Sequence, residues 1–389
     1  MGMHCQYPIG INTCDIQRVF IIITNFLTPS YILLSLVAAA SRCNRILKDL
    51  ASHGKTSTNN LMLDSTDKVR KSSTMNKCWI SKRCFVHFYL VGLLSLAIAT
   101  ICHFDCHQRH AQYQEVDSEP DTSIVSRKIA VILLTIHLAR RSYECIYIQQ
   151  HRKESSKMQF AGYLLGLWHY TVLPLVFWDI DAMYNTLVPD SNIGIEDEQC
   201  LAQKTSYSAT KITTTMKLFF LLMIIINIWL QFEQHLHHTI LADIRRAALV
   251  TKTINTDTQE QDNLNLRQCY SLPPHRRWFR YVLCPHYLAE ILIYLSFAII
   301  LENAAATTVQ NYLLCKSMNG NNFEYFFSFE RMISSFLMGR RRRHWSLFIW
   351  VLTNLTISAM NNRDWYNLRY RNDTDHSRDK RKALFPMVL

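Results

Sequence analysis

Long apolar segments recur along the whole chain, and this recurrence limits the folds that are open to it. A bilayer core of ~30 Å is crossed by roughly 20 apolar residues in a helix, and most of the segments approach that length once their flanking residues are included. The segments cover residues 19–40, 85–101, 129–148, 160–178, 218–230, 287–301 and 345–360. The sequence therefore predicts an all-α, polytopic membrane helix bundle with six to seven transmembrane helices. The fifth and sixth segments are short enough to be buried core helices or partial spans instead.

The charge between the segments alternates as a membrane topology requires. Cytosolic loops carry an excess of Lys and Arg, whereas loops on the far side do not. Residues 42–83, 151–157 and 245–280 are basic, while residues 105–121 and 190–198 are acidic. This alternation predicts seven spans, with the N-terminus in the lumen and the C-terminus in the cytosol.

The net charge of +12 is explained by this topology. Nucleic-acid binding would instead require a basic face on a soluble domain, so no nucleic-acid partner is predicted. One run opposes the topology: the four arginines at 340–343 precede the last segment and would fall on the lumenal side. They mark either a re-entrant segment or a different number of spans.

The twelve cysteines include no CxxC pair or other close zinc-finger spacing, so neither a disulfide framework nor a zinc module is predicted. Cys102, His103, Cys106 and His107 could be metal ligands, but their spacing equally fits an ordinary helix end. No metal site is therefore assigned. None of the nine glycines forms a GxGxxG or GxxxxGK[ST] phosphate motif, so a nucleotide would be held by side chains at helix ends.

Charged side chains inside the third segment are candidates for a functional site, because a charge within a span is costly. His137, Arg141 and Glu144 are spaced four and three residues apart and so share one helical face. Arg140 stands four residues before Glu144, which allows an ion pair. We expect Arg141 to face a polar cavity, whereas Arg140 could equally extend to the lipid headgroups.

The predicted topology brings polar residues of other segments to the same, cytosolic side. They are Gln234, His235, His237, His238 and Arg245 after the fifth segment, His286 and Glu290 in the sixth, and Trp365, Tyr366, Arg381 and Lys382 after the last. A single histidine here would more often be structural, and the two aromatic residues could belong to an interfacial belt. Together these residues predict a cytosol-facing pocket that suits an anionic dinucleotide.

Five stretches, taken in order, resemble the polyprenal (polyprenol) reductases, the type-3 branch of the steroid 5-alpha-reductase family. They read SKRCFVHFY at 81–89, HLARRSYECIY at 137–147, YLLGLWHY at 163–170, CPHYLAEILIY at 284–294 and KRKALFP at 380–386. The resemblance implies a single integral membrane reductase domain over 1–389, with the C-terminal region of the steroid 5-alpha-reductases at 216–389. It also implies a multi-pass protein of the endoplasmic reticulum that takes a polyprenyl lipid, and no obligate protein partner is inferred.

The activity that this resemblance implies is NADPH-dependent reduction of the alpha double bond of polyprenal to dolichal, which supplies dolichol for protein N-glycosylation. The catalytic candidates are Tyr89, as donor to the substrate carbonyl, and His87 beside it. The implied cofactor-binding residues are Arg141, Gln234, His238, Arg245, His286, Glu290, Tyr366 and Arg381. Tyr89 could equally be an interfacial anchor.

Two departures from the family pattern concern the adenosine end of the cofactor site. Asn362 stands where a histidine is usual, and RNDTDHSRD at 371–379 replaces a shorter stretch. Three other functions remain open at this point: a steroid 3-oxo-5-alpha 4-dehydrogenase, a trans-2-enoyl-CoA reductase, and a non-enzymatic seven-span receptor or transporter. A transporter should show Gly- or Pro-interrupted spans paired between two halves, and the sequence has no such pairs.

Overall fold

The computed structural model describes residues 30–36, 79–113, 122–149, 157–178, 214–254, 273–318, 343–369 and 381–384. The helices are α4 (Phe85–Tyr113), α5 (Thr122–Tyr143), α6 (Phe160–Val172), α9 (Thr214–Ile254), α11 (Pro285–Met318) and α13 (Arg343–Arg369), and residues 30–36 are also helical. Shorter helical turns are η2 (Lys82–Cys84), η3 (Glu144–Ile148), η4 (Leu173–Val176) and η5 (Arg277–Arg280), and the strands are β1 (Trp79–Ser81) and β2 (Lys157–Gln159). The described part of the chain is mainly helical, as the apolar segments predict.

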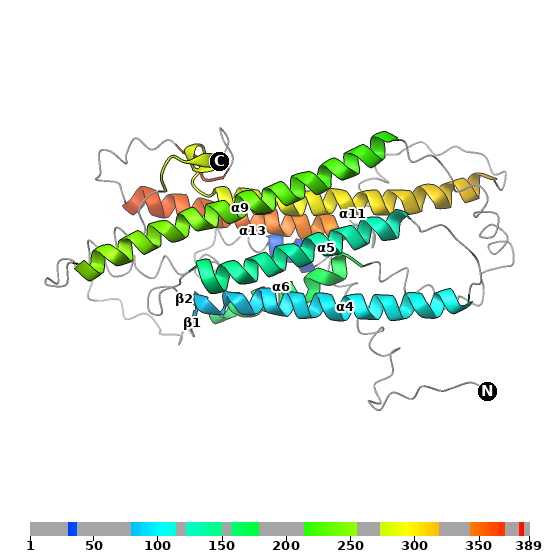
Figure 1. Ribbon diagram of the computed structural model, residues 1–389, viewed down its shortest axis with the longest axis horizontal. Helices are drawn as coiled ribbons and strands as arrows, with labels where there is room; N and C mark the ends of the chain where they lie inside the picture. Colours follow the sequence, from blue (N-terminus) through cyan, green and yellow to red (C-terminus); the bar gives the residue numbers. More distant parts are fainter. Residues whose placement is uncertain are drawn as a thin grey trace, which may run out of the picture.

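The helices run side by side along the long axis of the molecule (Figure 1). α11 packs against α9, α13 and α5, and α4 packs against α5 and α6. The beginnings of α4 and α11 lie at the same end as the last residues of α5, α9 and α13 (Figure 1). This arrangement confirms the prediction that the polar ends of these segments converge on one side of the bundle.

Three helices within the described residues are long and apolar enough to cross a membrane: Lys82–Phe104, Leu218–Ala247 and Pro285–Glu302. The last two contain the fifth and sixth apolar segments, so both of these segments lie in helices long enough for a full span. The fourth segment forms a shorter apolar helix, Phe160–Val176, and α5 and α13 are more polar. The count of six to seven spans stays a prediction, because most of 19–40 lies outside the described residues.

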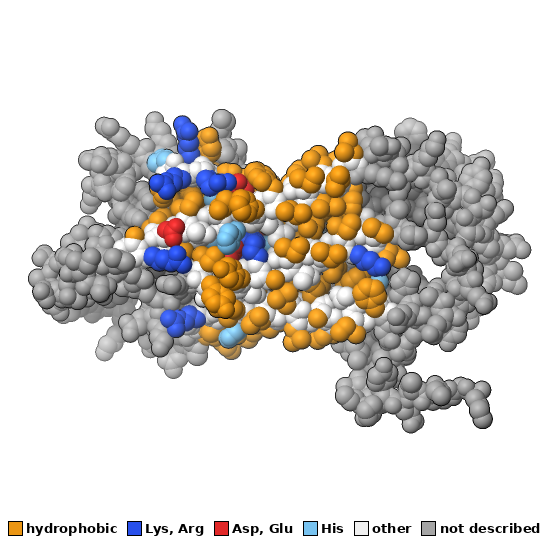
Figure 2. All heavy atoms as spheres, viewed as in Figure 1, with side chains coloured by type: hydrophobic (Ala, Val, Ile, Leu, Met, Phe, Trp, Pro, Cys, Tyr) orange, Lys and Arg blue, Asp and Glu red, His pale blue; other side chains and the backbone are white. Residues whose placement is uncertain are grey.

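The surface of the bundle fits a lipid environment. Apolar side chains cover much of the middle of the face shown in Figure 2, and charged side chains gather mainly toward one end. Leu94, Ile132, Leu218 and Ile225 are each about half exposed or more. So large an exposed apolar surface is unusual for a soluble monomer and typical of a membrane protein.

A short antiparallel pair of strands fixes the starts of α4 and α6 next to each other. Trp79 of β1 pairs with Gln159 of β2, and both helices begin soon after their strands. The ring of Phe88 on α4 then stacks on the ring of Tyr170, with centroids 5.9 Å apart and planes 9° apart. A Cβ added to Gly166 would lie 2.6 Å from the Phe88 ring, so this position is closed to larger residues.

Gly166→Ala is expected to destabilise the protein by about 1–3 kcal/mol, because the packed ring of Phe88 must move to make room. Gly162→Ala is the matched control, since nothing lies within 4 Å of a Cβ added there. Alanine favours a helix over glycine by up to about 1 kcal/mol, so this control should be neutral or stabilising. Thermal unfolding of both variants in detergent checks the difference, and equal melting temperatures would contradict the packing described.

A cap of irregular chain closes the polar end of the bundle. Arg277 has a positive φ of 51°, which is uncommon for a residue other than glycine. Its guanidinium forms two hydrogen bonds to the buried carboxylate of Glu233 on α9, one of them from Nε at 3.1 Å. Leu283 and Cys284 then donate backbone hydrogen bonds to residues 382 and 383 of the C-terminal segment. The chain ahead of α11 is therefore anchored to both α9 and the C-terminal segment.

Candidate functional site

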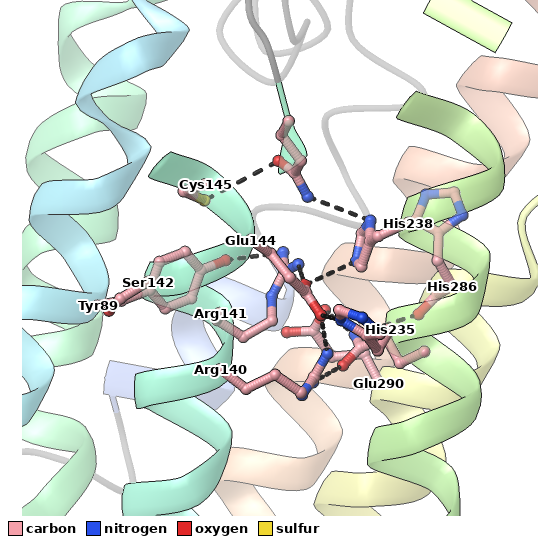
Figure 3. A network of polar contacts seen from close by, with 12 residues as sticks. Tyr89, Arg140, Arg141, Ser142, Glu144, Cys145, His235, His238, His286 and Glu290 are labelled. Carbon is pink, nitrogen blue, oxygen red and sulfur yellow. Dashed lines mark hydrogen bonds and ion pairs between the residues drawn. The ribbon is translucent and has the colours of Figure 1, made fainter. Parts of the chain in front are cut away.

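The carboxylate of Glu144 is the centre of a buried polar network at the end of α5 (Figure 3). It is fully buried, and its two oxygens bind different arginines: Oε1 accepts from Arg140, and Oε2 lies 2.5 Å from Nη1 of Arg141. His235 on α9 places Nδ1 2.9 Å from Oε1. The predicted pairing of Arg140 with Glu144 is confirmed.

Glu144 also opens η3, a π-helical turn. Such turns are rare and are frequently found at functional sites. The turn ends next to Gln149, whose Nε2 lies 3.1 Å from Nδ1 of His238 on α9. Nε2 of the same histidine is 3.8 Å from Glu144 Oε2. The irregular turn therefore supplies two side chains that contact α9.

Arg141 links Glu144 to Tyr89 on α4. Its Nη2 donates a hydrogen bond of 2.9 Å to the Tyr89 hydroxyl, and its guanidinium carbon lies 5.1 Å from the centre of the tyrosine ring. Both side chains are buried. The Tyr89 ring also meets the ring of Tyr170 edge to face, with centroids 5.0 Å apart. Tyr89 is thus held by ring packing and by an arginine together.

Gln234 on α9 connects this network to α11. Its Oε1 accepts from Arg140, and its Nε2 lies 2.9 Å from Glu290 Oε2 and 3.4 Å from the backbone oxygen of His286. The His286 ring lies 5.3 Å from the ring of His238. Four helices, α4, α5, α9 and α11, therefore contribute side chains to one cluster (Figure 3).

The network has buried donors that no described residue satisfies. Nε of Arg140, Nε of Arg141 and Nε2 of His238 are buried and have no hydrogen-bond partner among the described residues. Buried polar groups in proteins nearly always have a partner, so unpaired donors at one place indicate a bound ligand or water. Two arginine donors suit an anionic or carbonyl group of such a ligand.

Six of the ten predicted site residues lie together in this cluster. They are Tyr89, Arg141, Gln234, His238, His286 and Glu290. His87 lies elsewhere: it is exposed, and its Nδ1 is 2.9 Å from the hydroxyl of Tyr163. Arg245 is partly buried and lies about two helical turns beyond His238 on α9.

Tyr366 and Arg381 belong to the cap rather than to the cluster. Tyr366 packs in a second apolar core with Cys284 and Leu384. Arg381 is buried, and its Nη1 donates to the backbone oxygens of residues 273 and 279, both at 2.8 Å. Asn362, which stands at the position of a family histidine, points its Nδ2 at Cys284 Sγ, 3.6 Å away. Cofactor contacts by Tyr366 and Arg381 stay predictions.

Four members of the cluster were not among the predicted site residues: Arg140, Glu144, His235 and Gln149. Glu144 could have been found from the sequence, because it shares a helical face with Arg141. His235 was seen only as one of several polar residues after the fifth segment. Gln149 has no such signal, since its position depends on the π-helical turn that precedes it.

The chain is similar in sequence to known polyprenal reductases and to a steroid dehydrogenase family, and the region matched by that family includes helices of the buried cluster. The family model described as 3-oxo-5-alpha-steroid 4-dehydrogenase matches residues 200–322, which include all of α9 and α11. A polyprenal reductase of Xenopus laevis is 26% identical over 267 residues, covering 66% of this chain and 70% of that protein. A polyprenal reductase of Caenorhabditis elegans is 25% identical over 300 residues, covering 71% and 82%.

Similarity extends to plants. Polyprenal reductase 1 of Arabidopsis thaliana is 24% identical over 335 residues, covering 80% of this chain and 82% of that protein. Polyprenal reductases of a frog, a nematode and a plant thus align with this chain over most of their length. The chain is therefore similar to polyprenal reductases over most of its length and, over residues 200–322, to the 3-oxo-5-alpha-steroid 4-dehydrogenase family.

Proposed function

We propose that this chain is an NADPH-dependent polyprenal reductase that reduces the alpha double bond of polyprenal to dolichal. The contact between Arg141 and the Tyr89 hydroxyl carries this proposal, because it places a buried hydroxyl beside a cation, in a chain similar to polyprenal reductases. We further propose that the protein resides in the endoplasmic reticulum membrane with its C-terminus in the cytosol, and that its product supplies dolichol for N-glycosylation.

The buried cluster suits a nicotinamide cofactor, which the family uses. The unpaired Nε donors of Arg140 and Arg141 and the Nε2 of His238 fit the oxygen-rich surface of a dinucleotide. NADPH, rather than NADH, is the cofactor that we propose. Arg141, Gln234, His238, His286 and Glu290 would hold its nicotinamide end, and Arg245, Tyr366 and Arg381 would lie toward the rest of it. When bound, NADPH would supply a hydride to the beta carbon of the enal, and a proton, ultimately from water, would complete the reduction at the alpha carbon.

The residues of the chain must then stabilise the charge that develops on the aldehyde oxygen. A donor that is fixed in a site without water stabilises such a charge far better than the same donor in solution. The Tyr89 hydroxyl is the proposed donor, since it is buried and already held by Arg141. His87, the second catalytic candidate, bonds to Tyr163 on the exposed side of α4, so we prefer Tyr89.

The polyprenyl tail should stay in the bilayer. Each methylene moved out of water is worth ~0.8 kcal/mol, but lipid already solvates the tail, so an enclosed protein tunnel would gain little. Only the aldehyde and the first isoprene units then need to enter the bundle. Turnover should therefore depend weakly on chain length once a few units are present, and a rigid steroid without a tail should be a poor substrate.

The proposal is tested by assaying the purified protein in lipid with NADPH and three substrates: polyprenal, a 3-oxo-4-ene steroid and a trans-2-enoyl-CoA. We expect kcat/KM to be highest for polyprenal. A higher value for the steroid or the thioester would show that the chain acts on another enone or enoyl substrate. Reduction of none of the three would favour the receptor or transporter hypothesis.

A further inference from the structure

Glu144 contacts Arg141, which in turn contacts the proposed catalytic residue Tyr89. It is the shared acceptor for Arg140 and Arg141, and only Arg141 reaches on to Tyr89. We propose that Glu144 is a positioning residue, which fixes Arg141 so that the Tyr89 hydroxyl is oriented and strengthened as a donor to the substrate carbonyl. This inference rests on the proposed function and adds a residue to its machinery.

The direction of each hydrogen bond follows from the chemistry of the groups. Arginine has five N–H donors and no acceptor, so the Tyr89 oxygen must accept the bond from Arg141 Nη2. The hydroxyl proton of Tyr89 is therefore left to point at another group. A cationic donor on the same oxygen also withdraws electron density and makes that O–H a stronger donor. A substrate carbonyl oxygen is an acceptor of the kind that this proton requires.

Glu144 is the group that holds Arg141 in this orientation. Its carboxylate is acceptor-only, it is fully buried, and its Oε2 is 2.5 Å from Arg141 Nη1. The two nitrogens of one rigid, planar guanidinium therefore face two fixed oxygens, one on Glu144 and one on Tyr89. Since the arginine fork is flat, fixing Nη1 also fixes the direction in which Nη2 points.

The charges of this group suit an oxygen that becomes negative. Arg140 and Arg141 contribute two positive charges and Glu144 one negative charge, so these three residues carry a formal charge of +1, while Glu290, which adds a second negative charge to the cluster, hydrogen-bonds to Gln234. Without Glu144, the buried guanidinium of Arg141 and the partly buried one of Arg140 would stand close together and repel each other, and Arg141 would lose its orientation. Glu144 therefore makes the close approach of two arginines possible.

A double-mutant cycle separates positioning from a merely structural role. The variants are Glu144→Gln, Tyr89→Phe and the two combined, and kcat for polyprenal is measured at saturating NADPH. We expect Glu144→Gln to lower kcat by at least about tenfold when Tyr89 is present and by less than about threefold in the Tyr89→Phe background, because groups that act as one unit are not additive. Equal fold-losses in the two backgrounds would overturn the inference.

The controls keep a negative result interpretable. Ser142→Ala is the matched variant, since Ser142 is also buried on α5 but, among the described residues, its hydroxyl bonds to the backbone oxygen of Leu138 within its own helix. Its kcat should equal that of the wild type, and the Kd of NADPH, measured by quenching of protein fluorescence, should change less than threefold in Glu144→Gln. A large rise in that Kd with unchanged kcat would assign Glu144 to cofactor binding and overturn the inference.

A second cycle applies if Glu144→Gln does not fold. Arg141→Lys keeps the positive charge but replaces the rigid fork with a single flexible ammonium group, so it cannot face both oxygens in the same way. Its loss of kcat should likewise shrink in the Tyr89→Phe background, and additive losses would contradict the inference. Failure of the wild type to reduce polyprenal would reject the proposed function itself, which is a different outcome.

Discussion

Arg141→Ala is expected to lower kcat/KM for polyprenal by at least about 1,000-fold. The change removes the donor to the Tyr89 hydroxyl and one of the two arginines that neutralise the buried Glu144. Losing a fixed donor to a developing oxyanion costs about 10²–10³ in rate, and breaking a buried ion pair adds to that loss. Initial rates of the purified variant in lipid, at several NADPH concentrations, measure both the fall in kcat and the expected rise in KM for NADPH.

Arg246→Ala is the matched control for this variant. Arg246 also pairs with a carboxylate three residues away, Asp243, but at 3.2 Å and with both side chains largely exposed. Exposed pairs contribute at most about 1 kcal/mol, so stability and kinetics should stay close to those of the wild type. Wild-type kinetics in Arg141→Ala as well, at normal protein levels, would contradict the assignment of the site.

Tyr89→Phe is expected to lower kcat by about 100- to 1,000-fold, the range found when one oxyanion donor is removed. Phenylalanine keeps the ring that packs on Tyr170 and under Arg141, so the fold should be retained. The KM for NADPH should change little, since only a hydroxyl is lost. Steady-state kinetics and a melting curve test these expectations.

Tyr163→Phe distinguishes the two catalytic candidates. It also removes one hydroxyl, but that hydroxyl contacts His87 on the exposed side of α4. A near-normal kcat is expected. If Tyr163→Phe were as damaging as Tyr89→Phe, the chemistry would have to lie near His87 instead.

Most of the fold follows from the apolar segments, although their ends do not. The segment 218–230 lies within the much longer helix α9, which continues past Gln231, Gln234 and His238. These polar residues break the hydropathy signal, yet they face the interior and are buried, Gln234 completely. The part of α9 after residue 230 has low hydropathy because it bears the polar residues of the site. The full length of α9 therefore becomes apparent only from its packing against α11.

The cluster itself could be predicted where helical spacing and topology act together. Arg141 and Glu144 share a face, and the order of the helices brings Gln234 and Glu290 to the same end. His87 and Tyr89 are two positions apart on α4, which is roughly 200° around a helix, so spacing alone argues against both facing one site. Spacing does not reveal which of the two points inward.

The contacts of Arg381 in the cap could not be predicted from the sequence. The described hydrogen bonds of Arg381 go to two backbone oxygens of the chain before α11. Backbone carbonyls leave no mark in a sequence, and the loop that presents them depends on the left-handed conformation of Arg277. The sequence alone does not distinguish an arginine that binds a phosphate from one that binds the backbone of a loop.

The central claim is that polyprenal is reduced at the buried cluster of Tyr89, Arg141 and Glu144. The most direct test is a single-turnover reaction of the purified protein in lipid with polyprenal and NADPH deuterated at C4 of the nicotinamide, followed by mass spectrometry of the lipid product. The wild type should give dolichal with one deuterium on the beta carbon, and Arg141→Ala with saturating cofactor should form it at least about 100-fold more slowly. Formation of labelled dolichal at the same rate by both proteins would contradict the claim.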